Sequence, residues 1–189
     1  MSKVAIVGDP SGTGTFTISA PNGNTDRTLV LPDEAGTVLT SAGVPASAMP
    51  AGSVIQVKEF IDVGSYIATT STSFVDTGIH LAITPSSASS KILVIANFNA
   101  NTGGGAGSGI RVSIRRNGST FLFGGNNGPI FYDSNAGYVH SQGALIKLDS
   151  PNTTASTDYS IWIASQSGSQ AGIARDWGDA RILLMEIAA

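Results

Sequence analysis

Apolar and polar residues alternate along most of this chain in short stretches separated by turn signals, a pattern that predicts β-strands. From about residue 53 the alternations lengthen, and two of them are especially regular: KILVIANFNA and DYSIWIASQ. The residues that share one apolar face are Ile92, Val94, Ala96 and Phe98 in the first stretch, and Tyr159, Ile161 and Ile163 in the second. We therefore expect long strands here, with these faces directed into a core.

The stretch GIRVSIRRNGSTFLF predicts a β-hairpin. Apolar residues at 110, 112 and 114 alternate with polar ones, and Asn117-Gly118 is typical of a two-residue type I′ turn. A loop of that length would pair Ile114 with Phe121 and residue 112 with residue 123. We expect both pairs on the same apolar face.

The last strand, ARILLMEIAA, is apolar on both faces. Ile182 and Leu184 point one way, while Leu183, Met185 and Ile187 point the other way. A strand of this kind is covered on both sides, so we expect a central strand that also meets another subunit through Leu183, Met185 and Ile187. Because no stretch shows a helical period with caps, the predicted fold class is all-β, an antiparallel jelly-roll β-sandwich.

The first 50 residues differ from the rest, because their alternations are very short and are interrupted by turn dipeptides such as Asn22-Gly23. A two-stranded hairpin is marginal in water, so this segment needs another surface to cover it. We expect an N-terminal arm over residues 1–40, a linker of small residues over 41–52 and a β-sandwich domain over 53–189.

Composition narrows the function classes. Charged residues make up 12% of the 189 residues, the formal net charge is −3 and there is no run of Lys or Arg, which argues against nucleic-acid binding. The chain has no cysteine, so disulfides and thiolate metal sites are excluded. No secretory signal and no apolar run of about 18 residues is present, so we expect synthesis in the cytoplasm and no membrane insertion.

Motifs for catalysis and cofactors are weak. The opening VAIVGDPSGTGTFTI has glycines after a strand pattern but lacks the lysine and the following helix of a phosphate-binding loop. His80 and His140 are the two histidines, fewer than the three protein ligands that a zinc site usually needs. We therefore expect no metal and no cofactor.

Two segments could contact a ligand. In RDWGDAR, Asp176 and Asp179 flank Trp177, which suits either sugar stacking or a charged loop with a packed tryptophan. The glycine-rich loop over 123–138 offers Phe131, Tyr132 and Tyr138 as aromatic faces, and the alternative is that its glycines simply permit tight turns. These six residues are our candidate glycan or receptor contacts.

Enzymatic activity is not expected. A glycosidase needs two carboxylic acids that flank the scissile bond, and the acids of the globular part are dispersed apart from the pair in RDWGDAR. Glutamate occurs at positions 34, 59 and 186, and we interpret Glu186 as a strand-end charge. A G-x-S-x-G motif is also absent.

Two stretches carry a family resemblance. STSFVDTGIHLAITPSSASSKILVIANFN (71–99), followed by IRRNGS, resembles a β-sandwich domain of tailed-bacteriophage fibre and tail-associated proteins, similar in outline to the trimeric jelly rolls of the tumour-necrosis-factor and C1q type. GTFTISAPNGNTDRTLVLPDEAGTVLT (14–40) resembles the N-terminal virion-anchoring segment of phage tail fibres. The resemblance implies a homotrimer in the virion, with residues 1–50 docked on another virion protein. The candidate docking residues are Val4, Ile6, Phe16, Ile18, Leu29 and Leu31.

The resemblance implies a non-enzymatic tail fibre or short spike that recognises a host-surface glycan. The chain departs from a fibre in one respect, since only residues 41–52 separate the arm from the domain, whereas fibres usually carry a long shaft there. A capsid decoration or head-fibre protein fits this short spacing as well. A polysaccharide depolymerase is the third alternative, and the dispersed carboxylates argue against it.

Overall fold

The computed structural model describes residues 10–15, 17, 22–24, 26, 28, 44, 48–62, 65–103, 107–123, 130–132, 139–173 and 178–189, with the backbone alone at 130–132 and 139. The chain divides into two compact units, Met1–Val38 and Leu39–Ala189. In the first unit the described residues are exposed, with a turn at 10–11 and a bend at 22–24, where the sequence has Asn22-Gly23. Most of the predicted arm lies outside the described residues.

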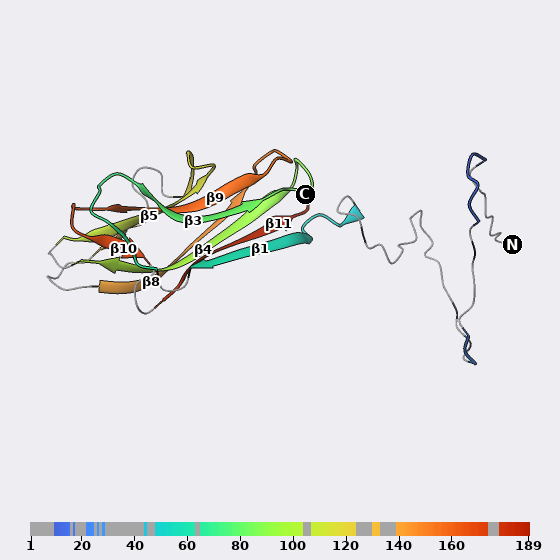
Figure 1. The fold of residues 1–189 in the computed structure, drawn as a ribbon, viewed down its shortest axis with the longest axis horizontal. Coiled ribbons are helices and arrows are strands. Elements are labelled where there is room, and N and C mark those ends of the chain that lie inside the picture. Colours follow the sequence, from blue (N-terminus) through green and yellow to red (C-terminus); the bar gives the residue numbers. More distant parts are fainter. Residues whose placement is uncertain are drawn as a thin grey trace. The chain divides into compact units, whose positions relative to one another are not determined.

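The second unit consists of antiparallel strands, and the described residues contain no α-helix. The first sheet contains β1 (Val54–Asp62), β2 (Ile67–Thr69), β4 (Lys91–Thr102), β8 (Val139–Asp149), β10 (Ala171–Ile173) and β11 (Ala180–Ile187). The second contains β3 (Val75–Ile83), β5 (Gly109–Arg116), β6 (Thr120–Phe123), β7 (Ile130–Tyr132) and β9 (Thr157–Ser165). The two sheets form the layers of a sandwich (Figure 1), which confirms the predicted all-β antiparallel fold class.

The core lies between the two sheets, where the predicted apolar faces meet. Its fully buried side chains include Ile92, Val94 and Ala96 of β4, Ile110, Val112 and Ile114 of β5, Tyr159 and Ile161 of β9, and Ile182 and Leu184 of β11. Complete burial of an isoleucine, valine or leucine side chain stabilises a fold by about 1.5–3 kcal/mol. The alternation in the sequence therefore identified the core faces correctly.

The hairpin of β5 and β6 keeps its predicted turn residues but not its predicted loop length. Asn117 and Gly118 have φ angles of 50° and 69°, the positive values that a type I′ turn requires. Arg116, however, pairs with Thr120, so three residues rather than two connect the strands.

This difference changes which side chains of β6 face the core. Arg115 pairs with Phe121, and a bulge at Leu122 then lets Ile114 pair with Phe123. The prediction that Phe121 shares the core face is therefore wrong: Phe121 is 38% exposed, and Leu122 packs against the core instead.

The longest strand, β4, pairs with two different strands along one edge. Its residues 91–97 pair with β11 and its residues 100–102 pair with β10, while β8 pairs along the whole of the other edge. Gly178 and Asp179 precede β11, and Gly178 packs against Asn99, between the stretches of β4 that pair with β11 and with β10.

Candidate functional site

The outer face of the first sheet carries apolar side chains in rows that cross four neighbouring strands. The pairing of β1 with β11, β11 with β4, and β4 with β8 places these residues side by side. One row contains Val57, Met185, Leu93 and Leu148, and the next contains Glu59, Leu183, Ile95 and Ile146. We call the seven apolar members of these two rows the apolar face.

The apolar face is open to solvent. Ile146 is 57% exposed, Val57 is 54% exposed and Leu148 is 49% exposed. The predicted interface residues Leu183 and Met185 are half-buried in its middle, and Ile187 continues it along β11. A contiguous exposed apolar patch marks an interaction surface in a folded protein, so this face is our first candidate site.

The same side of the sheet becomes polar along the strands. Its further rows contain Ile61, Arg181, Asn97 and Ala144, then Asn99 and Gln142, then Asn101 and His140. Arg181 lies at the border, with its guanidinium 3.8 Å from the Glu59 carboxylate and 3.5 Å from that of Asp179. These exposed pairs contribute little to stability, at most about 1 kcal/mol, but they add charge beside the apolar face.

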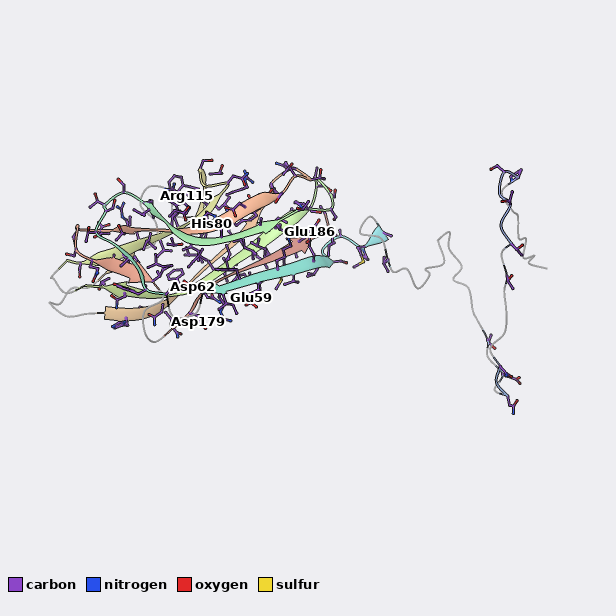
Figure 2. The ribbon with its side chains drawn as sticks, in the orientation of Figure 1. Glu59, Asp62, His80, Arg115, Asp179 and Glu186 are labelled. Carbon is purple, nitrogen blue, oxygen red and sulfur yellow. The ribbon has the colours of Figure 1, made fainter. Side chains whose placement is uncertain are left out.

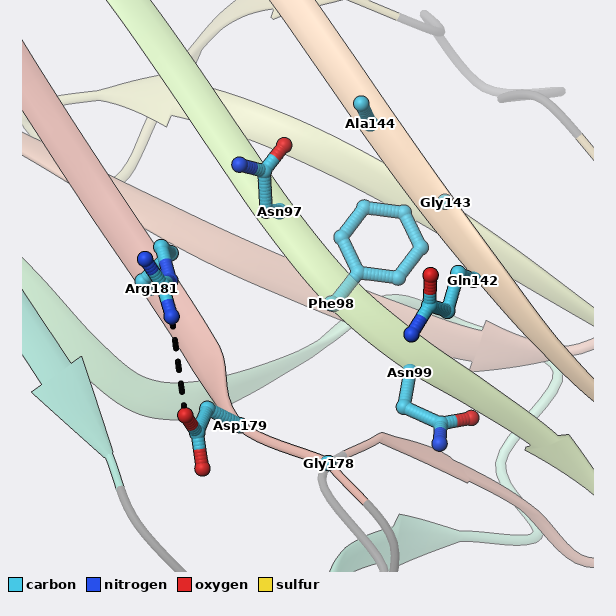
Figure 3. A pocket seen from close by; sticks show the side chains of 9 residues that line it. All are labelled: Asn97, Phe98, Asn99, Gln142, Gly143, Ala144, Gly178, Asp179 and Arg181. Carbon is cyan, nitrogen blue, oxygen red and sulfur yellow. Dashed lines mark ion pairs between the residues drawn. The ribbon is translucent and has the colours of Figure 1, made fainter.

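A pocket of about 590 Å³ opens at the polar end, where Gly178 and Asp179 lie beside β4 and β8. Its lining consists of Asn97, Phe98, Asn99, Gln142, Gly143, Ala144, Gly178, Asp179 and Arg181 (Figure 3). Asp179 was a predicted glycan contact, and the structure places it here. Amide and carboxylate groups of this kind hydrogen-bond neutral polar ligands or backbone groups of a partner.

Within this pocket Asn99 is tightly held. Its side chain is 8% exposed, and its Oδ1 has no hydrogen-bond partner in the described part of the chain. Gly178 packs directly on it, because a Cβ at position 178 would lie 2.9 Å from the Asn99 Cβ. A buried hydrogen-bond acceptor without a partner costs free energy, so Asn99 Oδ1 favours a hydrogen bond from a donor outside the described residues.

The outer face of the second sheet carries a different cluster, made of Phe74, Arg115, Phe121 and Trp162, which we call the arginine cluster. The Arg115 guanidinium carbon lies 4.0 Å from the Trp162 ring centroid, 4.2 Å from that of Phe121 and 5.4 Å from that of Phe74. The two phenylalanine rings meet edge to face at 5.9 Å. The cation is therefore surrounded by aromatic faces, each of which attracts it.

His80 lies near this cluster and bridges two carboxylates. Its Nδ1 is 2.8 Å from Asp158 Oδ2, and its Nε2 is 2.9 Å from Asp76 Oδ1. A β-bulge with Gly78 at φ 77° brings residues 76 and 80 together, although four residues of extended strand span about 13 Å. Burial lowers the pKa of His80, but the hydrogen bonds to both aspartates outweigh it and raise the pKa above 6.5.

Glu186 is fully buried at one end of the core, so its interpretation as a strand-end charge is wrong. Its carboxylate accepts hydrogen bonds from Gln56 Nε2 at 2.6 Å, Ser86 N at 2.7 Å and Ser86 Oγ at 2.6 Å. Burial alone raises the pKa of this carboxyl, but these bonds outweigh it and hold the pKa below its ordinary value of 4.5. The group thus ties β11 to β1 and to the loop after β3.

Most of the predicted ligand-contact and docking residues are not among the residues that the structure describes. This is true of Tyr138, Asp176 and Trp177, and of the six docking residues Val4, Ile6, Phe16, Ile18, Leu29 and Leu31. Phe131 and Tyr132 belong to β7, where their backbone pairs with Ile110 and Gly109, and nothing is stated of their side chains. The exposed residues of β8 and the arginine cluster were not predicted from the sequence.

Two negative findings concern the described residues. The described residues contain no group of three or more His, Asp or Glu side chains arranged to hold a metal ion. They also contain no helix that is long and apolar enough to cross a membrane.

No protein-family model matches this chain, and no curated protein matches it either. The family resemblance given by residues 14–40 and 71–99 therefore stays a prediction. Functional inference rests on the chain's own sequence and on its two outer faces.

Proposed function

We propose that this protein is a non-enzymatic structural protein of a bacteriophage virion, a homotrimeric tail fibre or short spike that presents a jelly-roll domain for recognition of a host-surface glycan. It is made in the host cytoplasm and resides in the virion. The trimeric part of the proposal is carried by the apolar face. The virion part is supported by the resemblance of residues 14–40 and 71–99 to phage fibre segments.

The apolar face suits further copies of this chain. Its two rows cross four strands about 4.8 Å apart and advance about 7 Å along them, so it covers only a few hundred Å². A stable interface buries about 800 Å² per partner around an apolar centre and a polar rim. The exposed side chains of Asn97 and Gln142 on the same sheet would supply that rim.

A single substitution in the apolar face tests the association. In Ile146→Glu a charge replaces a side chain that is 57% exposed in the single chain, so the fold should tolerate it while the interface should not. Thr120→Glu, at an exposed position of β6 on the other sheet, is the matched control. Light scattering after size exclusion should give a trimer for the wild type and the control, and a monomer for Ile146→Glu. A trimeric Ile146→Glu variant would refute the assigned interface.

The N-terminal segment is proposed to dock the trimer on another virion protein. Deletion of residues 1–50 should leave a folded trimer that no longer joins the particle. Among the described residues the strands begin at Val54, so the deletion removes no strand of the two sheets described. If the shortened protein were unfolded or monomeric, the segment would belong to the core and the domain division would be wrong.

The short linker favours a second candidate function, a capsid decoration or head-fibre protein with the same trimeric architecture. Cryo-electron microscopy of the assembled particle separates the two. Trimers at the tail or baseplate support host recognition, and trimers at three-fold positions of the capsid support decoration. Release of reducing sugar from host polysaccharide would instead support a depolymerase.

A further inference from the structure

The arginine cluster contains a cation that is held by aromatic rings rather than by a direct ion pair. Burial lowers the pKa of Arg115, and the charge of Asp76 offsets part of this effect. Arg115 donates one hydrogen bond, from Nη1 to the Gly118 carbonyl oxygen at 3.2 Å. In the described part of the chain it has no ion-pair partner, and its Nη2 makes no hydrogen bond. The two nearest acids on this face, Asp76 and Asp158, are both engaged by His80.

The surroundings of Arg115 are fixed by the sheet rather than by a free loop. Residue 115 pairs with Ser160 of β9 on one side and with Phe121 of β6 on the other. Trp162 Nε1 donates a hydrogen bond to Ser160 Oγ at 2.9 Å, which sets the orientation of the indole ring. A ligand that binds here would meet a site whose geometry already exists, which lowers the entropic cost of binding.

The cluster also offers apolar contact area beside the cation. Phe121, which pairs with Arg115 across the two strands, is 38% exposed. Arg115 covers one side of Trp162 and contacts Phe121, so an incoming group would meet the guanidinium edge together with exposed phenylalanine surface. A ligand that matches this surface combines a carboxylate with a ring that presents C–H groups, as an acidic sugar does.

We propose that the arginine cluster binds an acidic saccharide, with the sugar carboxylate on Arg115 and the sugar ring against Phe121. The inference rests on the proposed recognition function and gives it a ligand class and a location. His80 of β3 and Arg115 of β5 lie on the sheet opposite Glu59 of β1 (Figure 2). The cluster therefore stays open when the apolar face of the first sheet is covered by other copies.

The test uses the full chain and a panel of oligosaccharides in acidic and neutral pairs, such as sialyllactose with lactose, and oligoglucuronates with oligoglucosides. Binding is measured by calorimetry, and poly-glutamate serves as a non-saccharide polyanion. Arg115→Gln is compared with Lys147→Gln, which removes the same charge from an exposed position of β8. Circular dichroism and light scattering on each variant report its fold and its assembly.

We expect the wild type and Lys147→Gln to bind at least one acidic sugar more tightly than its neutral counterpart. Arg115→Gln should weaken that binding at least about tenfold, because one charge-assisted hydrogen bond is lost. Three results would overturn the proposal: no acidic sugar of the panel binds, Arg115→Gln binds as the wild type does, or poly-glutamate binds as tightly as the sugar. If light scattering showed that the wild type is a monomer, the proposed trimer would be refuted, and the calorimetry would still test saccharide binding at the arginine cluster.

Discussion

Glu186 offers a quantitative test of how the sandwich is held together, because one buried carboxylate connects three segments. Glu186→Gln keeps the size of the side chain and removes its charge. One oxygen becomes an amino group, which would face Gln56 Nε2, a donor at 2.6 Å. Gln56 could turn its amide to relieve this clash, but it would then lose its hydrogen bond of 2.8 Å to the Thr84 carbonyl oxygen.

The expected cost follows from these contacts. A hydrogen bond to a charged group contributes about 1.5–3 kcal/mol, and the substitution removes at least one such bond. We therefore expect Glu186→Gln to lower the free energy of unfolding by about 2 kcal/mol at pH 7. Glu186→Ala should cost about 3–5 kcal/mol, since it abolishes all three accepted bonds and leaves a cavity. Glu59→Gln, at an exposed site 3.8 Å from Arg181, should change stability by less than about 0.5 kcal/mol.

The pH dependence gives a second readout. Because the pKa of Glu186 in the folded protein lies below 4.5, its stabilising contribution is complete above pH 4.5 and is lost as the pH falls through the folded-state pKa. The difference between wild type and Glu186→Gln should thus shrink in acid. The assay is urea unfolding at several pH values and one protein concentration, since association adds to apparent stability. A difference below about 0.5 kcal/mol at pH 7, or one independent of pH, would refute this reasoning.

Three further substitutions probe other contacts. Tyr159→Phe should cost about 1–3 kcal/mol in urea unfolding, because it removes the buried hydrogen bond of 2.8 Å from the Tyr159 hydroxyl to Asp149, and equal stability would contradict this. His80→Ala should lower the free energy of unfolding by at most about 1 kcal/mol. Because the pKa of His80 is raised in the folded protein, this loss of stability should be present below pH 6.5 and disappear as the pH rises through the folded-state pKa. A pH-independent loss would show that the ion pairs are not responsible. Gly172→Ala should lower the melting temperature, because the new Cβ would lie 2.7 Å from the Ile67 carbonyl oxygen and 2.6 Å from the Tyr66 ring. Gly168→Ala is the control: its Cβ would meet no atom within 4 Å, so this variant tests only the backbone strain at φ 87°.

The sequence predicted the core faces because alternation and burial have the same period of two in a strand. Ile92 and Val94 of β4 and Ile182 and Leu184 of β11 were all assigned to the correct side. Glu186 continues the alternation of Ile182 and Leu184, and that continuity was the available signal that it points inward.

The candidate sites were harder to predict, because they depend on which strands become neighbours. Ile146 and Leu148 join Leu183 and Met185 only because β4 lies between β8 and β11, and no local pattern fixes that order. The arginine cluster depends on a one-residue change of loop length, which turned Phe121 away from the core and towards Arg115. A bulge of this kind leaves little trace in the sequence.

The central claim is that the apolar face joins three copies of the chain. The chain has no cysteine, so an Ala144→Cys variant carries a single spin label per subunit, at a position beside the apolar face. Dipolar spectroscopy then reports the number of labels in the assembly and the distance between them. The account predicts a three-spin signal, with a shorter distance than for a label at Thr120 on the opposite sheet, which lies about 10 Å farther from the interface. The absence of a dipolar signal, or a shorter distance at Thr120, would contradict it.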